Sequence, residues 1–128
     1  MEKSSEEKRF SIVKRAKSFT YAGRGIWILL KTTHNAWIHL VILAIAILLG
    51  LYLHIARIDW LLLTFAAGMV LAAEAFNTAI EIDIDLTSPN FHPYAKDTKD
   101  VAAGAVLLTA ICAAIIGAVI FLPYLYNV

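Results

Sequence analysis

The sequence predicts an all-α integral membrane protein with three transmembrane helices and an N-terminal amphipathic helix on the membrane surface. Of its 128 residues, 60% are hydrophobic and 16% are charged, whereas soluble domains are close to half apolar and a quarter charged. Eight of the eleven basic residues fall in the first 31 positions, and no acidic residue occurs between Glu7 and Asp59. A chain of this length supports one membrane-embedded domain, residues 1–128, with little room for an enclosed site.

The first segment, about residues 5–34, mixes apolar side chains such as Phe10 and Trp27 with basic ones. This mixture indicates an amphipathic helix on the inner membrane surface, with a break expected at Gly23 or Gly25. A basic tract before an apolar span is typical of a cytoplasmic segment that lies against anionic headgroups. Nucleic-acid binding, the other common use of such a tract, is not expected because membrane spans follow.

The first span is predicted at about residues 36–55. From Ile38 to Leu53 the polar interruptions are His39 and Tyr52. With its flanks this run reaches the roughly 17–25 residues that a membrane-crossing helix needs.

The second span is predicted at about residues 60–86, with Asp59 as its N-cap. Its uncharged part, Trp60–Ala73, is too short to cross a bilayer alone. Because the helical pattern continues to Leu86, we expect a helix of about 40 Å that carries its charges beyond one membrane surface.

The third span is predicted at about residues 98–122. Val101–Leu122 holds 22 residues without a charge and is followed by Pro123, where the helix is expected to end. Asp97, three residues before Asp100, resembles a capping signature. With the basic N-terminus in the cytoplasm, three spans place the loop after the second span inside and the C-terminus outside the bacterial plasma membrane.

Four polar residues share one face of the second predicted span: Glu74, Asn77, Glu81 and Asp85. At about 100° per residue they fall within a sector of roughly 80°, while Asp83 points to the opposite side. Charged side chains at membrane depth usually face the bundle interior or a wet cavity. Lys96 and Lys99, which follow the next loop, are the expected counter-charges.

A face of this composition suits phosphoryl transfer, which needs Mg²⁺ on hard oxygens, cations on the phosphates and a base for the attacking hydroxyl. Two other interpretations stay open at this point: a proton or ion relay through the membrane, and ion pairing at a helix end with a structural role alone. The sequence contains no G-x-x-x-x-G-K-[ST] motif, which excludes a P-loop. Gly23-Arg24-Gly25 is too short to identify a phosphate-binding loop.

One segment of the chain resembles a known family. Glu74-Ala-Phe-Asn77-Thr78-Ala79-Ile80-Glu81-Ile-Asp-Ile-Asp85, followed by His92, Lys99-Asp100 and Ala102-Ala-Gly-Ala-Val-Leu107, resembles the prokaryotic diacylglycerol kinase family, which includes undecaprenol kinases. Tyr21-Ala-Gly-Arg24-Gly25-Ile-Trp27, with Lys31 and His34-Asn35, is similar to that family's N-terminal region. The resemblance covers roughly residues 10–125.

The resemblance implies a homotrimer with active sites composed between subunits, and phosphorylation of a lipid alcohol by ATP and Mg²⁺ at the inner membrane face. It implies that Glu74 is the general base, that Asn77 positions substrate or phosphate, and that Glu81 binds the metal. Lys99 is the third implied catalytic residue. The residues implied to bind nucleotide or substrate are Arg24, Asp85, His92, Lys96 and Asp100. For His92 a structural role in its loop is an equally good interpretation.

The chain departs from the family pattern in two places. Thr33 stands where the family often has a second metal-binding glutamate, and Trp37 stands where an arginine is common. No acidic residue lies between Lys8 and Ile58 to replace that glutamate. Either Mg²⁺ relies on Glu81, phosphate oxygens and water, or the protein is less active than its relatives.

The resemblance implies that the acceptor is diacylglycerol or undecaprenol, and since each presents one hydroxyl at the interface, the site chemistry does not distinguish them. The loop Ser88–Pro93 is more similar to the undecaprenol-type branch. The alternative function is a non-catalytic small membrane protein or ion-relay subunit that uses the same carboxylate face. A phosphatase or transferase is weaker still, since Cys112 is mid-span and no serine lies beside a histidine.

Overall fold

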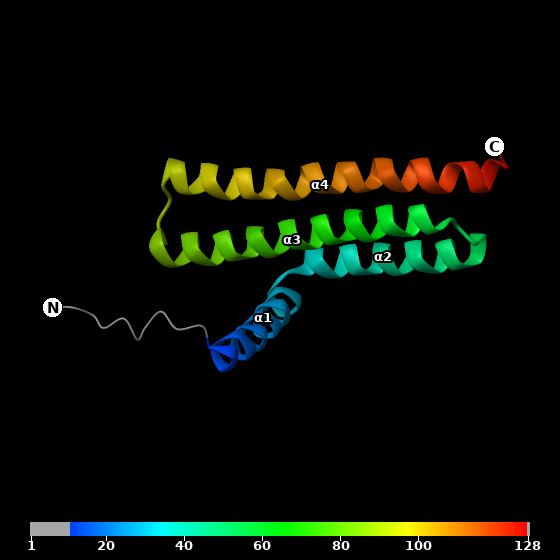
Figure 1. Ribbon diagram of the computed structural model, residues 1–128. Helices are drawn as coiled ribbons and strands as arrows, with labels where there is room; N and C mark the ends of the chain where they lie inside the picture. Colours follow the sequence, from blue (N-terminus) through cyan, green and yellow to red (C-terminus); the bar gives the residue numbers. More distant parts are fainter. Residues whose placement is uncertain (1–10, 128) are drawn as a thin grey trace.

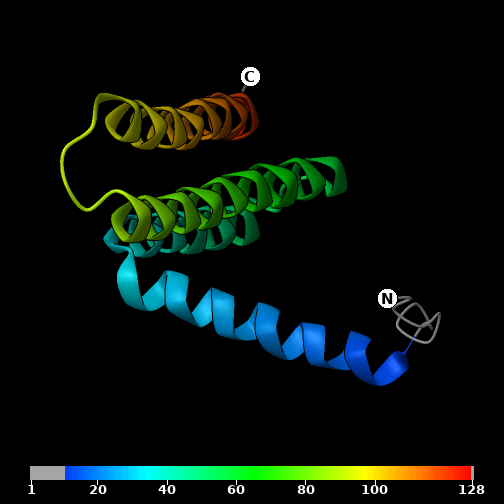
Figure 2. The ribbon, with the colours of Figure 1, turned by 90° about the vertical axis from the view of Figure 1, so that its left-hand side faces the viewer.

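Four helices make up the computed structural model, which describes residues 11–127. They are α1 (Ile12–Thr32), α2 (His34–Leu53), α3 (Arg57–Thr87) and α4 (Pro93–Tyr126). Helix α3 lies alongside α2 and α4 and runs antiparallel to both, and α1 leaves this group obliquely (Figures 1 and 2). The described residues contain no strand, and α2, α3 and α4 are each long and apolar enough to cross a membrane. The predicted fold class is confirmed.

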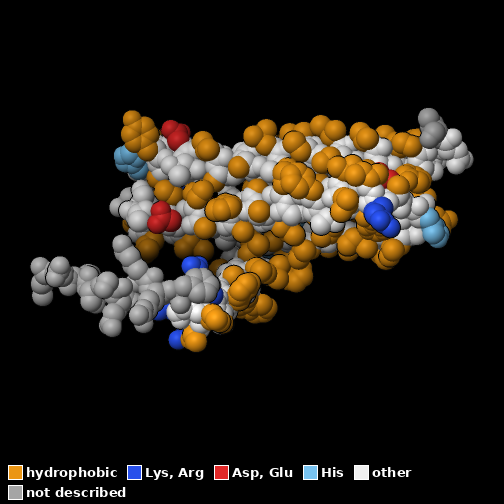
Figure 3. Space-filling model, viewed as in Figure 1, with side chains coloured by type: hydrophobic (Ala, Val, Ile, Leu, Met, Phe, Trp, Pro, Cys, Tyr) orange, Lys and Arg blue, Asp and Glu red, His pale blue; other side chains and the backbone are white. Residues whose placement is uncertain are grey.

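The outer surface of the three long helices is hydrophobic. Figure 3 shows apolar side chains along their length, with charged groups gathered at the two ends and on α1. Large side chains such as Phe65 and Leu108 are 64% and 66% exposed, whereas the buried positions include small residues such as Ala36, Ala66 and Ala102. Lipid tails are as apolar as leucine, so membrane helices approach one another through small residues and leave large ones outside.

The lengths of α2 and α3 determine where the polar residues of α3 lie relative to α2. α2 has 20 residues and α3 has 31, or about 30 Å and 46 Å. The C-terminal part of α3 therefore extends beyond the start of α2, and it runs past the corner between α1 and α2 (Figure 1).

The α1–α2 corner is a single extended residue. Thr33 has φ −119° and ψ 110°, and its N–H donates to the Leu29 carbonyl at 3.1 Å. The Trp37 indole donates to the Leu30 carbonyl at 2.6 Å, which ties the start of α2 back to α1. The break expected at Gly23 or Gly25 is wrong: α1 is continuous, because glycine weakens a helix by about 1 kcal/mol without ending it. The predicted start near residue 5 lies outside the described residues.

The α2–α3 turn requires a glycine at one position. His54 adopts the left-handed region with φ 52°, and the Ile55 N–H donates to the Gly50 carbonyl at 3.2 Å. This return places the Trp60 ring against Gly50, where an added Cβ would lie 2.8 Å from Cη2 of the ring. Gly50 thus allows the close approach of α2 and α3 at this end.

Asp59 does not cap α3 as predicted. The helix begins at Arg57, so Asp59 lies inside its first turn, where its carboxylate accepts the Ala56 N–H at 3.2 Å. The same oxygen accepts the Tyr124 hydroxyl at 2.9 Å. Asp59 thus accepts the N–H of the N-cap residue from the third helical position, and it also ties α3 to the end of α4.

Helix α4 is longer than predicted at both ends. It begins at Pro93, whose missing N–H costs nothing in a first turn, and the His92 ring accepts the Tyr94 N–H at 3.2 Å. Asp97 and Asp100 therefore lie within the helix and do not cap it. Pro123 removes one backbone donor near the C-terminus, and α4 continues past it to Tyr126.

Candidate active site

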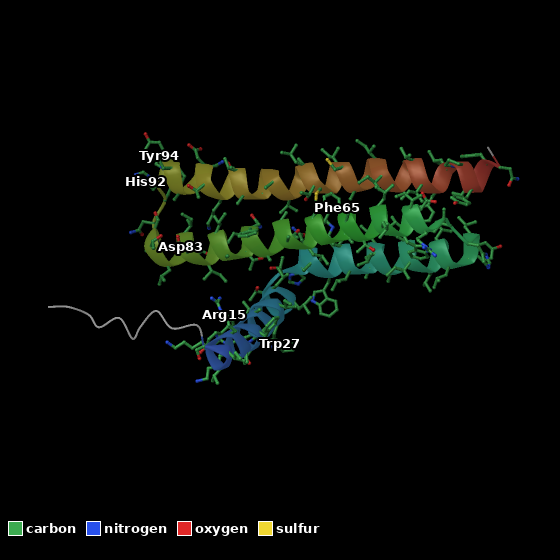
Figure 4. The ribbon with its side chains drawn as sticks, in the orientation of Figure 1. Arg15, Trp27, Phe65, Asp83, His92 and Tyr94 are labelled. Carbon is green, nitrogen blue, oxygen red and sulfur yellow. The ribbon has the colours of Figure 1, made fainter. Side chains whose placement is uncertain are left out.

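The polar face of α3 has a buried inner part and an exposed outer part. Glu74, Asn77 and Thr78 are the buried polar side chains among residues 11–127. Glu81 and Asp85 continue the same face and are exposed. Asp83 is also exposed, and Figure 4 places it at the end of the bundle that carries His92 and Tyr94. The face therefore leads from the packed interior of the chain to its loop end.

Glu74 is fully buried, and its partner comes from α2. The His39 Nε2 lies 3.1 Å from Glu74 Oε1, while Glu74 Oε2 has no hydrogen-bond partner. A carboxylate oxygen accepts hydrogen bonds, so the ring N–H donates in this contact. His39 is a residue of this face's buried part that the sequence analysis did not identify. Its signal was available, because a histidine inside an otherwise apolar span is costly unless it has a use.

Asn77 connects the two parts of the face. Its amide Nδ2 donates to Glu81 Oε1 at 3.2 Å, and its Oδ1 is buried without a partner. Glu74 Oε2 and Asn77 Oδ1 are thus two unpaired oxygens one helical turn apart. Leaving a buried acceptor unsatisfied costs about 1–3 kcal/mol, so native structures rarely do so unless a ligand uses the atom.

Thr33 brings the α1–α2 corner to this face. Its Oγ1 lies 2.8 Å from Thr78 Oγ1, and either hydroxyl can donate. Thr78 is four residues after Glu74 and three before Glu81, so Thr33 contacts α3 between these two carboxylates. The position at which the family often has a glutamate therefore lies at the site.

The two predicted counter-charges have different partners. Lys99 pairs with Asp85 across the α3–α4 loop at 2.5 Å, as expected. Lys96 pairs instead with Asp100, one turn along α4. The Lys99 and Asp85 side chains are 39% and 67% exposed, and such solvated pairs contribute at most about 1 kcal/mol. Lys99 can exchange its carboxylate for a phosphate at small cost.

His92 and Arg24 lie apart from the buried part of the face. His92 is exposed at the start of α4, with its ring 5.5 Å from that of Tyr94 (Figure 4). Arg24 is exposed on α1. Among the described residues, neither forms a hydrogen bond or ion pair with the α3 face.

The oxygens present suit a magnesium ion that arrives with phosphates. No group of three or more His, Cys, Asp or Glu side chains within residues 11–127 is arranged to hold a metal. The local donors are the exposed Glu81 carboxylate and the unpaired Asn77 Oδ1. Mg²⁺ commonly binds one or two protein oxygens and completes its shell with water and substrate phosphates, and this set fits that pattern.

An apolar groove of about 380 Å³ lies against α3 between α2 and α4. His39 and Leu71 line it near Glu74, and it extends to Phe121 on α4. On the α4 side the groove is lined by small residues, including Ala110 and Gly117, which leave space between the helices. His39 thus borders both the groove and the buried carboxylate.

The residues of this face lie in a part of the chain that matches a known protein family. A family model described as "Prokaryotic diacylglycerol kinase" matches residues 20–121. An undecaprenol kinase of Bacillus subtilis is 38% identical over 121 residues, which cover 94% of this chain and 98% of the relative. A diacylglycerol kinase of Synechocystis sp. is 39% identical over 111 residues, or 86% of this chain and 63% of the relative. One of Helicobacter pylori is 32% identical over 106 residues, or 77% and 83%.

Proposed function

The chain belongs to the prokaryotic diacylglycerol kinase family and is a lipid kinase, and we propose that it uses ATP with Mg²⁺ to phosphorylate a lipid alcohol at the cytoplasmic membrane face. In this proposal the chain acts as one membrane-embedded domain in the bacterial plasma membrane. No comparison supports the alternative of an ion-relay or non-catalytic membrane protein.

The observation that carries the proposal is the unpaired Glu74 Oε2 beside the unpaired Asn77 Oδ1. In the proposed reaction the lipid hydroxyl donates its proton to Glu74 Oε2 as the hydroxyl oxygen attacks the γ-phosphorus. A new P–O bond forms to the lipid, and the P–O bond to the β-phosphate breaks. Such a base contributes about 10²–10⁴-fold to a rate. Asn77 holds Glu81 and orients the reacting groups.

The exposed end of the face is assigned to the nucleotide. Lys99 leaves Asp85 and neutralises charge on the transferring phosphoryl group. When bound, Mg²⁺ would be held by Glu81 and Asn77 and would supply charge stabilisation at the phosphates. Around them we assign nucleotide or substrate contacts to the polar residues of the loop end and of α1, namely Arg24, Asp85, His92, Lys96 and Asp100.

We propose undecaprenol as the acceptor. The undecaprenol kinase of B. subtilis matches this chain almost from end to end, whereas the match to the Synechocystis diacylglycerol kinase covers 63% of that relative. Diacylglycerol, which also presents a single hydroxyl, is the competing acceptor.

We also propose a homotrimer whose subunits share each site, with the N-terminus in the cytoplasm and the C-terminus outside. The support is physical. Glu81 and Asp85 are exposed in a single chain, as are the large apolar side chains of α2 and α4, so a neighbouring copy can complete the site and cover apolar surface. The basic side chains of α1 favour the cytoplasmic side.

Purified protein in detergent, given ATP, Mg²⁺ and either undecaprenol or diacylglycerol, tests these assignments by the amount of phosphorylated lipid formed. Glu74→Gln is expected to lower turnover by about 10²-fold or more while the protein stays folded. Asp83→Asn is the matched control, because it removes an exposed carboxylate of the same helix that lies off the face, and it should retain wild-type turnover. Full turnover by Glu74→Gln would exclude Glu74 as the base.

A further inference from the structure

We infer that His39 is a positioning residue that holds the Glu74 carboxylate in its reactive orientation. The inference rests on the proposed role of Glu74 as the base. His39 Nε2 and Glu74 Oε1 are 3.1 Å apart, and they bring together α2 and α3, which are joined by a distant turn. Glu74 is fully buried, whereas the His39 side chain is 20% exposed. The histidine is thus the more exposed member of the pair.

Energetics argue against a packing role for this ring. A buried carboxylate without a hydrogen-bonding partner is strongly destabilising, and a polar side chain inside a membrane helix is itself costly. Two apolar residues would fill the same space without either cost. The pair is therefore best explained by a requirement for an oriented carboxyl group at this depth.

The geometry divides the two oxygens of Glu74 between two tasks. His39 occupies Oε1, which fixes the carboxylate plane, and Oε2 stays unpaired. Oε2 is then the atom that meets the lipid hydroxyl. A base oriented by a third group is the arrangement by which enzymes keep such a residue in a reactive geometry. Because His39 also lines the apolar groove, the acceptor can reach the base along that side.

Few other ionisable groups lie near this pair. On α3 the next carboxylate is Glu81, two turns away, and on α2 the next histidine is the exposed His34. α1 contributes the exposed Lys31 near the corner, and α4 has one ionisable side chain between Val101 and Gly117, the exposed Cys112. None of these makes a hydrogen bond to Glu74 among the described residues, so the orientation of the carboxylate depends on His39.

Two substitutions that differ in reach provide the test. In His39→Gln the amide nitrogen lies near the position of the imidazole Nε2, so the donor is kept. In His39→Asn the side chain is shorter by one carbon–carbon bond, so its amide nitrogen does not reach Glu74 Oε1. We expect His39→Gln to keep kcat within about threefold, and His39→Asn to lose roughly 10–100-fold in kcat with KM for ATP and lipid nearly unchanged, because misplacing a catalytic group by about 1 Å costs about 10²-fold.

Three controls make the outcomes distinguishable. His54→Asn removes an imidazole from the far end of α2 and should leave the rate unchanged. In a Glu74→Gln background, His39→Asn should lower the residual rate no further, because the histidine acts through the carboxylate. Wild-type protein without kinase activity would defeat the proposed function itself. Equal kcat values for His39→Gln and His39→Asn in an active enzyme, or a loss confined to KM, would overturn the positioning role.

Discussion

Thr33 is the position at which one substitution tests the metal assignment most directly. It contacts Thr78 at 2.8 Å, and Thr78 precedes Glu81 by three residues on the same face of α3. Residues three apart on a helix have Cβ atoms about 5–6 Å from each other. Thr33→Glu therefore places a carboxylate near Glu81, at the position where the family resemblance implies a second metal-binding glutamate.

Thr33→Glu is expected to destabilise the protein without Mg²⁺, and Mg²⁺ binding is expected to oppose that loss. Without Mg²⁺, repulsion between a carboxylate at position 33 and the exposed Glu81 carboxylate costs at most about 1 kcal/mol, because solvent screens such pairs. Loss of the Thr33–Thr78 hydrogen bond adds about 1 kcal/mol. With Mg²⁺ at about a hundred times its dissociation constant, binding returns about 2.7 kcal/mol. Thr33→Glu should thus be markedly less stable than wild type in EDTA and recover most of the difference in Mg²⁺.

Thr33→Gln is the matched control, because it has the same bulk and also loses the threonine hydroxyl but adds no charge. Thermal unfolding in detergent, with EDTA and with Mg²⁺, measures the stability change. Initial rates against free Mg²⁺ at saturating ATP should show a half-saturating concentration about tenfold lower for Thr33→Glu, because the ion gains one further ligand; tenfold corresponds to about 1.4 kcal/mol. If the two variants respond to Mg²⁺ alike in both assays, position 33 does not contribute to a metal site.

Three further predictions concern other contacts. Lys99→Gln should lower kcat at least about tenfold yet shift the free energy of unfolding by less than about 1 kcal/mol, because its pair with Asp85 is solvated; a large stability loss with normal kcat would assign Lys99 a structural role. Gly50→Ala should destabilise the protein by about 1–2 kcal/mol, since the new Cβ would lie 2.8 Å from the Trp60 ring, whereas Gly23→Ala, which meets no atom within 4 Å, should be neutral or stabilising in the same thermal assay. Tyr124→Phe should lower stability by about 1 kcal/mol by removing the bond to Asp59. Kinase rates should stay at the wild-type level, because Tyr124 and Lys99 lie near opposite ends of α4.

The spans were predictable because each depends on a local run of apolar residues. The polar face was predictable because helical periodicity alone brings Glu74, Asn77 and Glu81 together. The ends of the helices were harder to predict. Pro93 and His92 start α4 before the charge-free run begins, and Pro123 interrupts a hydrogen bond without ending the helix. Such ends depend on the capping of individual backbone groups, which hydropathy does not report.

Apart from the Lys99–Asp85 pair, which a short loop brings together, contacts between helices were beyond prediction. Nothing in the order of residues shows that His39 meets Glu74, 35 positions away, or that Lys96 pairs along α4 with Asp100 and not with α3. The contact of Thr33 with Thr78 depends on the angle between α1 and α2, which a single extended residue sets. These pairings depend on which small residues pack between the helices. Because each span contains many small residues, the sequence does not show which of them are in contact.

The order of the assigned groups along α3 follows the direction in which the two substrates arrive. From Glu74 to Asp85 is 11 residues of helix, or about 16 Å. In the proposed assignment the base is deepest, next to the apolar groove and the uncharged run that precedes it. The metal ligand Glu81 lies in the middle, and the nucleotide contact Asp85 lies at the exposed loop end. A lipid reaches such a site from the bilayer and ATP from water, so one straight helix holds the acceptor hydroxyl and the phosphates in line. This accounts for the depth of Glu74, because a base at the exposed end would meet water before it met the lipid. It also leaves Glu74 away from water, so that its orientation depends on the bond from His39.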